Sequence, residues 1–195
     1  MKIKSAFLLA VIITIISCNQ NKKNPITTTD TEQPKIDSFF PLTSFLKGQM
    51  ALIDSTPITP LHYSITKEKT DSVWMKKEEL KSFLSPFFSP EITATNLTGF
   101  YQKSSFNDLS INSLTYTHDP TKALPDSLNL LHWDIYVNPE TEKITRVYMV
   151  KSLKLADKTY TQQLTWQVDK FAKIVLIDPE AKTGFVKEDK FVWSF

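Results

Sequence analysis

The strongest constraint on the fold is a change of hydrophobic period near residue 97. From there to the end of the chain, apolar residues alternate with polar ones, as is typical of strands with one buried face. Turn-forming pairs such as Asn107-Asp108, Asn138-Pro139 and Asp178-Pro179 divide this region. The expected strands span 98–106, 109–118, 131–138, 143–155, 159–170, 171–177 and 185–195. Consecutive strands joined by short turns predict an antiparallel meander.

Two amphipathic helices are expected before the alternating region. The first ends before Pro57, and its apolar stripe consists of Leu42, Phe45, Leu46, Met50 and Ile53. The second has Ser85-Pro86 as a new first turn, because proline cannot continue a helix, and its stripe is Leu80, Phe83, Leu84, Phe87 and Phe88. Residues 61–67 are predicted to be a strand and 69–72 a turn. These elements predict a single α+β domain at 38–195, with two N-terminal helices packed on an antiparallel β-meander of about six to eight strands.

Scarce residue types exclude several functional classes. The three glycines, Gly48, Gly99 and Gly184, are too far apart to form the clustered backbone N–H groups of a dinucleotide or nucleoside triphosphate loop. The single cysteine allows no disulfide, no CxxC redox pair and no thiolate zinc site. We therefore expect neither a metal nor a diffusible cofactor.

The N-terminal residues carry an export signal. Lys2 and Lys4 form a positive region, and residues 6–16 are uncharged, with Thr14 as the one polar interruption. As a helix this stretch spans about 16 Å, roughly half of the ~30 Å hydrocarbon core of a bilayer. Its length favours a signal peptide at 1–17, and a short anchor helix is the alternative.

The signal segment ends in Ile15-Ile16-Ser17-Cys18, in which two aliphatic residues and a small one precede the only cysteine. This ending resembles the lipobox of bacterial lipoproteins. The resemblance implies cleavage after Ser17 and attachment of a diacylglycerol to the Cys18 thiol, so that the covalent lipid is the only cofactor. Two or three acyl chains hold a protein stably on a membrane, whereas one chain binds it only marginally.

Residues 18–37 are expected to form the lipidated cysteine and a flexible tether. The tether is rich in Asn, Gln, Thr, Lys and Pro and cannot bury enough apolar surface to order itself. Loss of Lys2 and Lys4 with the signal leaves 21 of the 23 basic residues against 21 acidic ones. The mature chain then has no formal net charge, and nucleic acid is not an expected partner.

The start of the tether also bears on localisation. Surface-exported lipoproteins of Bacteroidota carry acidic residues directly after the cysteine, whereas here the first acid is Asp30. By this resemblance the domain faces the periplasm. Asn19 stands where enteric bacteria place the aspartate that retains lipoproteins at the inner membrane, which favours an anchor in the outer membrane.

The histidines offer few candidates for catalysis or metal binding. His62 stands alone on an expected strand, and His118-Asp119 lies at an expected turn before Pro120. His132 and Asp134 share one strand face, about 6.5 to 7 Å apart along it. A substrate or ion between them is one interpretation, and an ordinary solvated strand face is the preferred one.

The aromatic residues either fill the core or line a lipid or carbohydrate pocket. Alternation places Trp133, Trp166 and Trp193 each on the apolar face of its strand, which favours the core.

Three Asp-Ser pairs match the short pattern at which Bacteroidota O-glycosylate exported proteins. The serines concerned are Ser55, Ser72 and Ser127. Asp-Ser pairs also occur in turns and helix caps, so a purely structural role is the alternative.

In sum the chain resembles envelope lipoproteins of Bacteroidota. The first functional hypothesis is a lipid-anchored, non-catalytic binding or assembly module in the periplasm that docks an envelope protein or a glycan through a sheet face or edge. The alternative is a carrier of an apolar ligand, a lipid or a lipoprotein, in a cavity between sheet and helices. A metal or serine hydrolase is a third hypothesis, which would need His132 or His118 in a cleft beside a carboxylate.

Replacement of Cys18 by Ala tests the anchor. We expect the variant to lose incorporation of labelled palmitate and to move from the membrane to the soluble fraction, because no thiol remains for the diacylglycerol. Unchanged labelling and membrane retention would disprove lipidation at Cys18.

Overall fold

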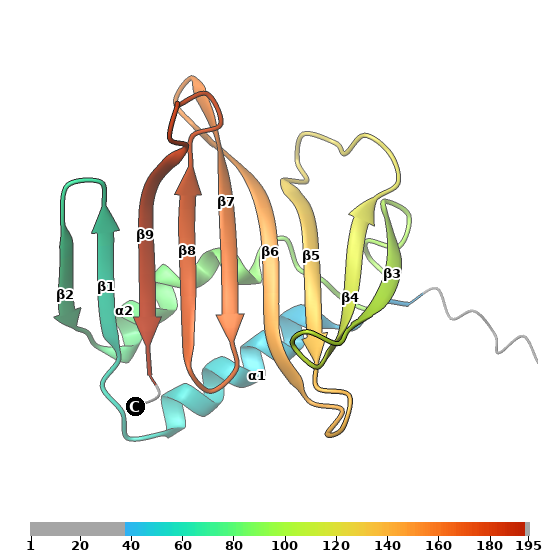
Figure 1. Cartoon of the computed structure of the whole chain (residues 1–195), viewed down its shortest axis with the longest axis horizontal. Coiled ribbons are helices and arrows are strands. Elements are labelled where there is room, and N and C mark those ends of the chain that lie inside the picture. The colour runs from blue at the N-terminus through green and yellow to red at the C-terminus, as the bar shows by residue number, and fades with distance from the viewer. Residues whose placement is uncertain (1–37, 194–195) are drawn as a thin grey trace, which may run out of the picture. The chain divides into compact units, whose positions relative to one another are not determined.

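Nine antiparallel strands form one sheet in the part of the chain that the computed structural model describes, residues 38–193 (Figure 1). The helical elements are α1 (Leu42–Ser55), α2 (Lys77–Phe83) and the 3-10 helix η1 (Ser85–Phe88). The strands are β1 (Leu61–Thr66), β2 (Thr70–Trp74), β3 (Tyr101–Asp108), β4 (Ser113–Pro120), β5 (Leu130–Val137), β6 (Ile144–Leu155), β7 (Lys158–Gln167), β8 (Phe171–Ile177) and β9 (Phe185–Val192).

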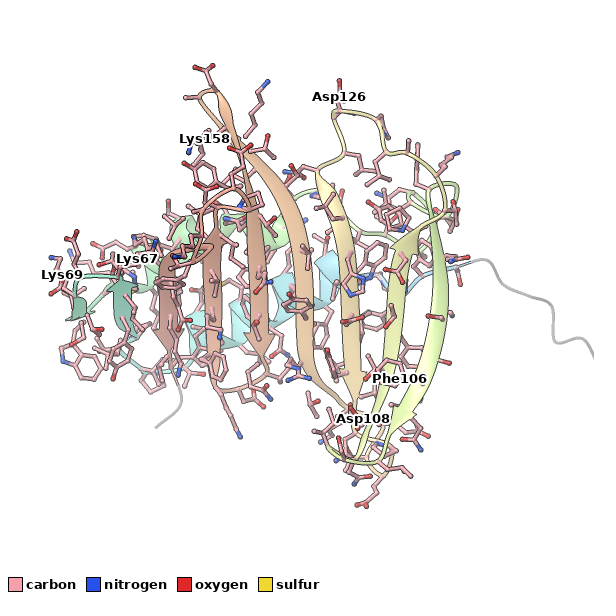
Figure 2. All side chains as sticks on the ribbon, turned by 45° about the horizontal axis from the view of Figure 1, so that its top comes forward. Lys67, Lys69, Phe106, Asp108, Asp126 and Lys158 are labelled. Atoms are coloured by element: carbon pink, nitrogen blue, oxygen red, sulfur yellow. The ribbon has the colours of Figure 1, made fainter. Side chains whose placement is uncertain are left out.

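The strand order is β2-β1-β9-β8-β7-β6-β5-β4-β3. Strands β3 to β9 therefore follow one another as a meander, and the β1–β2 hairpin extends the sheet when β1 pairs with β9. The tight turns lie where neighbouring strands end. Figure 2 labels Lys67 and Lys69 at the turn of the β1–β2 hairpin and Lys158 beside the β6–β7 turn. Strands β2 and β3 form the two edges of the sheet.

The predicted α+β class with an antiparallel sheet is confirmed, and two details are corrected. The meander β3–β9 has seven strands, within the predicted six to eight, but the β1–β2 hairpin enlarges the sheet to nine in the described chain. This hairpin also separates the two helices, which therefore do not both precede the strands. The turn expected at 69–72 is wrong, because Thr70–Trp74 pairs with β1. The turn lies at 67–69, where the Thr66 hydroxyl accepts hydrogen bonds from the backbone N–H groups of Glu68 and Lys69.

Both helices cover the same face of the sheet (Figure 1). The predicted stripe of α1 is buried at Leu42, Leu46, Met50 and Ile53, and Phe45 is partly buried. Trp133 on β5, Trp166 on β7 and Trp193, which directly follows β9, are buried as predicted. The ring of Phe87 in η1 meets that of Trp166 edge to face, with the centroids 5.4 Å apart. Within residues 38–193, no helix has the length and apolar character needed to cross a membrane.

The second helix breaks at the predicted place. α2 ends at Phe83, and Pro86 lies in the first turn of η1. A buried lysine on β6 satisfies backbone carbonyl groups at this break: Lys151 Nζ donates to the carbonyl oxygens of Pro86 and Ser89. Burial lowers the pKa of Lys151 to about 8.

One strand departs from regular alternation. Between Leu130 and His132 the pairing of β5 with β6 shifts by one residue, so that Leu130 is buried and Leu131 is 39% exposed. Regular alternation along the strand predicts Leu131 on the apolar face together with Trp133, and the exposure of Leu131 shows that this prediction is wrong. The extra residue is a β-bulge, which changes the face on which the preceding side chains lie.

A matched pair of substitutions on α1 tests the packing. Leu46 is fully buried and Leu52 is 57% exposed. We expect Leu46→Ala to lower the free energy of unfolding by ~2–5 kcal/mol through lost burial and a residual cavity. Leu52→Ala should change it by less than about 0.5 kcal/mol. Urea titration measures both, and similar losses would contradict the described packing.

Candidate functional site

One face of the sheet lies opposite the helices (Figure 1). The strand register places polar and aromatic side chains on this face. Directly paired residues on neighbouring strands share a face. One row of the open face crosses the sheet through Ser104, Thr117, Asp134, Tyr148, Thr165, Lys173, Lys190, Tyr63 and Ser72. A row of the helix-covered face instead runs through His118, Trp133, Met149, Leu164 and Ile174. The open face is therefore built to contact water or a polar partner.

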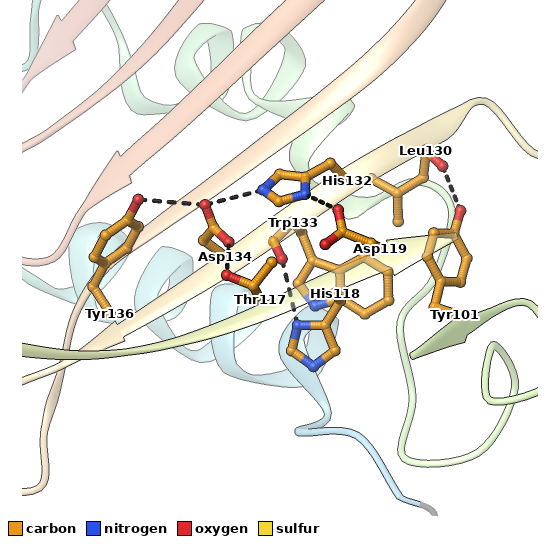
Figure 3. A network of polar contacts seen from close by, with 9 residues as sticks. All are labelled: Tyr101, Thr117, His118, Asp119, Leu130, His132, Trp133, Asp134 and Tyr136. Atoms are coloured by element: carbon orange, nitrogen blue, oxygen red, sulfur yellow. Dashed lines mark hydrogen bonds and ion pairs between the residues drawn. The ribbon is translucent and has the colours of Figure 1, made fainter. Parts of the chain in front are cut away.

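His132 is the centre of a polar cluster on this open face (Figure 3). Its Nδ1 lies 2.7 Å from Asp119 Oδ1 and its Nε2 lies 3.0 Å from Asp134 Oδ2. Asp134 also accepts hydrogen bonds from the Thr117 hydroxyl, at 2.7 Å, and from the Tyr136 hydroxyl, at 3.3 Å. Adjacent strands β4 and β5 supply all five side chains.

The cluster holds a proton on His132. The hydrogen bond with Asp134 raises the pKa of His132 to about 9, against the opposing effect of burial, and the bond with Asp119 adds to the rise. Burial alone would raise the pKa of Asp134, but the hydrogen bonds from His132 and Thr117 lower it overall. His132 is thus an imidazolium at neutral pH, and both ring nitrogens donate. A ring in this state has no lone pair for a general base.

His132 and Asp134 share one strand face as predicted, but their side chains bond directly to each other rather than hold a substrate or ion between them. The structure adds partners that the sequence did not indicate. Asp119 and Thr117 reach the pair from β4, because Thr117 is directly opposite Asp134. A turn was expected at Asp119-Pro120, but β4 continues to Pro120, so His118 and Asp119 are strand residues. Among residues 38–193, no group of three acidic, histidine or cysteine side chains is arranged to hold a metal ion.

His118 lies on the other face of β4, within the core. It is 1% exposed, stacks on Trp133 with the ring centroids 4.3 Å apart, and meets the edge of Phe39. Its Nδ1 donates to the backbone oxygen of Trp133 at 3.4 Å. Its Nε2 is buried and has no hydrogen-bond partner among the described residues. Burial lowers the pKa of His118 to about 4, so the ring is neutral at physiological pH.

A groove of about 510 Å³ opens beside His118 on the helix-covered face. Strands β4 and β5 form its floor, and Phe40, just before α1, contributes to its wall. Its apolar lining consists of Phe40, Leu114, Tyr116, Ile135, Val137, Pro139 and Ile144. Its polar lining consists of Lys103, His118, Asn138 and Glu142. This volume falls in the range of small-molecule sites, roughly 300–1,000 Å³.

His62 lies in neither the His132 cluster nor the groove beside His118. It lies on β1, stacks on Phe191 with the ring centroids 4.6 Å apart, and its Nε2 is 2.9 Å from Asp189 Oδ1. The three histidines therefore occupy three different environments, and only His132 lies beside carboxylates on the open face.

Cations cover two of the aromatic rings on the open face. The Arg146 guanidinium lies 3.7 Å from the centroid of the Tyr136 ring, and Lys190 Nζ lies 4.8 Å from that of Phe171. Such contacts are attractive because the ring face carries partial negative charge. The covered ring faces are not free for a second stacking partner.

The serines of the predicted glycosylation pattern are all exposed. Ser55 ends α1 and donates to the Leu52 carbonyl oxygen, Ser72 lies on the edge strand β2, and Ser127 lies between β4 and β5 beside Asp126 (Figure 2). Modification of these serines stays a prediction. Cys18 and the rest of 1–37 lie outside the described residues.

Comparison of the chain with protein-family models, with curated proteins and with solved structures gave no match.

His118 and His132 give opposite dependences of stability on pH. The pKa of His118 is depressed to about 4, so its contribution to stability is present above the unfolded value near 6.5 and is lost as the pH falls toward 4. The pKa of His132 is raised to about 9, so its contribution is present below about 6.5 and is lost as the pH rises toward 9.

We expect the free energy of unfolding to fall by on the order of 2 kcal/mol toward acidic pH because of His118, and by a similar amount toward alkaline pH because of His132. His118→Phe should flatten the acidic limb, and His132→Gln should flatten the alkaline limb. Urea titrations of the three chains from pH 4 to 9 measure this. If the His132→Gln variant still loses the same free energy of unfolding toward alkaline pH, the described ion pairs of His132 with Asp119 and Asp134 are wrong.

Proposed function

We propose that this protein is a lipid-anchored protein of the cell envelope, held by Cys18 in the outer membrane and facing the periplasm, where it acts as a non-catalytic binding or assembly module. The lipobox and tether in the sequence support the location. The binding role is supported by the sheet face on which no helix of residues 38–193 lies, and this is the observation on which the proposal rests.

The open face is specialised beyond what solubility requires. His132 uses both ring nitrogens to hold Asp119 and Asp134, which fixes the side chains on two neighbouring strands. Asp134 is only 8% exposed although it lies on the face without helices. Because fixed side chains lose little conformational entropy on binding, this region is preorganised for a partner.

The charges of this face favour a protein partner with acidic groups. Lys173 and Lys190 are directly opposite each other on β8 and β9, and like charges in that position are destabilising. Glu188 offsets one of them, with its carboxylate 3.6 Å from Lys173 Nζ. The remaining cations, Lys190 and Arg146, lie over aromatic rings. The covered faces of the Tyr136 and Phe171 rings are then unavailable to stack on sugars, which makes this part of the face less suitable for a glycan.

The groove supports a second candidate function, the carrier of an apolar ligand. A cavity was expected between the sheet and the helices that carry Phe45 and Phe83. That space is filled by side chains such as Leu46, Leu84 and Phe87, all fully buried. The groove lies instead over β4 and β5, beside Phe40. Its largely apolar lining is what a carrier requires.

Photo-cross-linking in intact envelopes tests the docking face. We place a photoreactive amino acid at Tyr148, in the centre of the open face, and at Lys47 on the exposed side of α1 as the matched control. We expect a single protein adduct from position 148 and none from position 47. Lys173→Glu with Lys190→Glu should reduce the adduct at least fivefold, whereas Lys47→Glu should leave it unchanged.

Equal adducts from both positions, or none from 148, would disprove docking through the open face. An adduct that disappears after glycan digestion would replace the protein partner by a glycan.

A further inference from the structure

The groove has a polar end and an apolar end. Along β4 its floor passes from His118 through Tyr116 to Leu114, and these four steps along the strand span about 13 Å. Opposite these residues on β5 lie Trp133, Ile135 and Val137, of which the last two line the groove. The length and the apolar lining fit one extended acyl chain.

The polar end holds a hydrogen-bond acceptor without a donor. His118 Nδ1 donates to the Trp133 carbonyl oxygen, so the proton of the neutral ring is on Nδ1 and Nε2 carries a lone pair. No described residue donates to this Nε2. A buried acceptor without a partner is costly, and a ligand that supplies a hydroxyl removes that cost.

A cation lies beside this acceptor. Lys103 is directly opposite His118 in the β3–β4 ladder, lines the groove, and has its Nζ 6.0 Å from the centroid of the Tyr116 ring. Glu142, the acidic residue of the lining, belongs to the β5–β6 turn near the other end of the floor. The charge arrangement therefore favours a ligand whose head group is anionic and lies toward His118 and Lys103.

We propose that the groove binds a single-chain amphiphile whose head group carries both a hydroxyl and an anionic group such as phosphate. The hydroxyl donates to His118 Nε2 once the side chains that cover this buried nitrogen move aside. The anion faces Lys103, and the chain lies over Tyr116, Ile135 and Val137. This inference rests on the second proposed function, the carrier, and is independent of docking through the open face.

Two synthetic probes separate the role of His118 from general affinity for lipid. The first is 1-O-dodecyl-glycerol 3-phosphate, and the second is its 2-deoxy counterpart, which lacks the hydroxyl. The lipid-anchored full chain is purified in polymer-bounded membrane discs, and bound radiolabelled probe is counted after rapid gel filtration. The Val137→Trp variant, whose groove is filled, gives the background from the discs.

We expect the unmodified chain to bind the hydroxyl probe about tenfold more tightly than the deoxy probe. His118→Phe keeps the stacked ring but removes the acceptor, and should bind both probes equally. His62→Phe is the matched control, because this histidine also stacks on a core ring but lies outside the groove. It should keep the full discrimination. Lys103→Met should weaken both probes by a similar factor.

Each other outcome overturns a defined part of the proposal. Equal binding of both probes by the unmodified chain, above the Val137→Trp background, leaves the carrier function standing and disproves the role of His118. Binding no greater than that background disproves the carrier function itself, and a groove filled by a segment of the chain gives this result. The inference is also disproved if the His118→Phe variant still binds the hydroxyl probe more tightly than the deoxy probe. Circular dichroism confirms that each variant is folded.

Discussion

Within residues 38–193 the helices cover one face of the sheet and leave the other face without a helix, and both candidate sites follow from this asymmetry. The two α-helices and the 3-10 helix of the described chain lie on one side of its nine strands, so alternate residues of each strand face different surroundings. On one side the alternation supplies tryptophan, leucine and methionine to a packed core. On the other it supplies tyrosine, threonine, lysine and acidic residues to an open surface.

Strand β5 shows how closely the two sites are linked. His132, Asp134 and Tyr136 face the open side, while Trp133, Ile135 and Val137 face the helices and the groove. The bulge at Leu131 sets this parity at the start of the strand. A shift by one residue would place the charged cluster in the core and Trp133 in water, so the register of this strand is strongly determined by burial.

Local sequence patterns predicted what depends on one segment at a time. Alternation and turn residues predicted the meander strands, and the helical stripes predicted α1 and the break at Pro86, since each signal lies within about a dozen residues. The His132 cluster was only half visible, because His132 and Asp134 share a strand but Asp119 and Thr117 reach them through cross-strand register. The β2 strand was missed for a similar reason: Thr70–Trp74 contains Asp71 and Ser72, which favour turns locally, and it becomes a strand by pairing with β1. The groove could not be predicted, because it depends on where α1 begins over the sheet.

Both histidine sites restrain the same short piece of backbone. The Trp133 carbonyl group accepts a hydrogen bond from His118 on the covered side. The neighbouring His132 and Asp134 side chains bond to each other and to β4 on the open side. Residues 132–134 are thus held from both faces of the sheet, by a neutral imidazole on one side and a charged imidazolium on the other. The pKa values of His118 and His132, about 4 and about 9, both lie far from neutral pH. Binding at one site near neutral pH therefore requires no change of protonation at the other. A rigid strand with two independent, preorganised faces is compatible with either proposed function, a partner on the open face or a ligand in the groove.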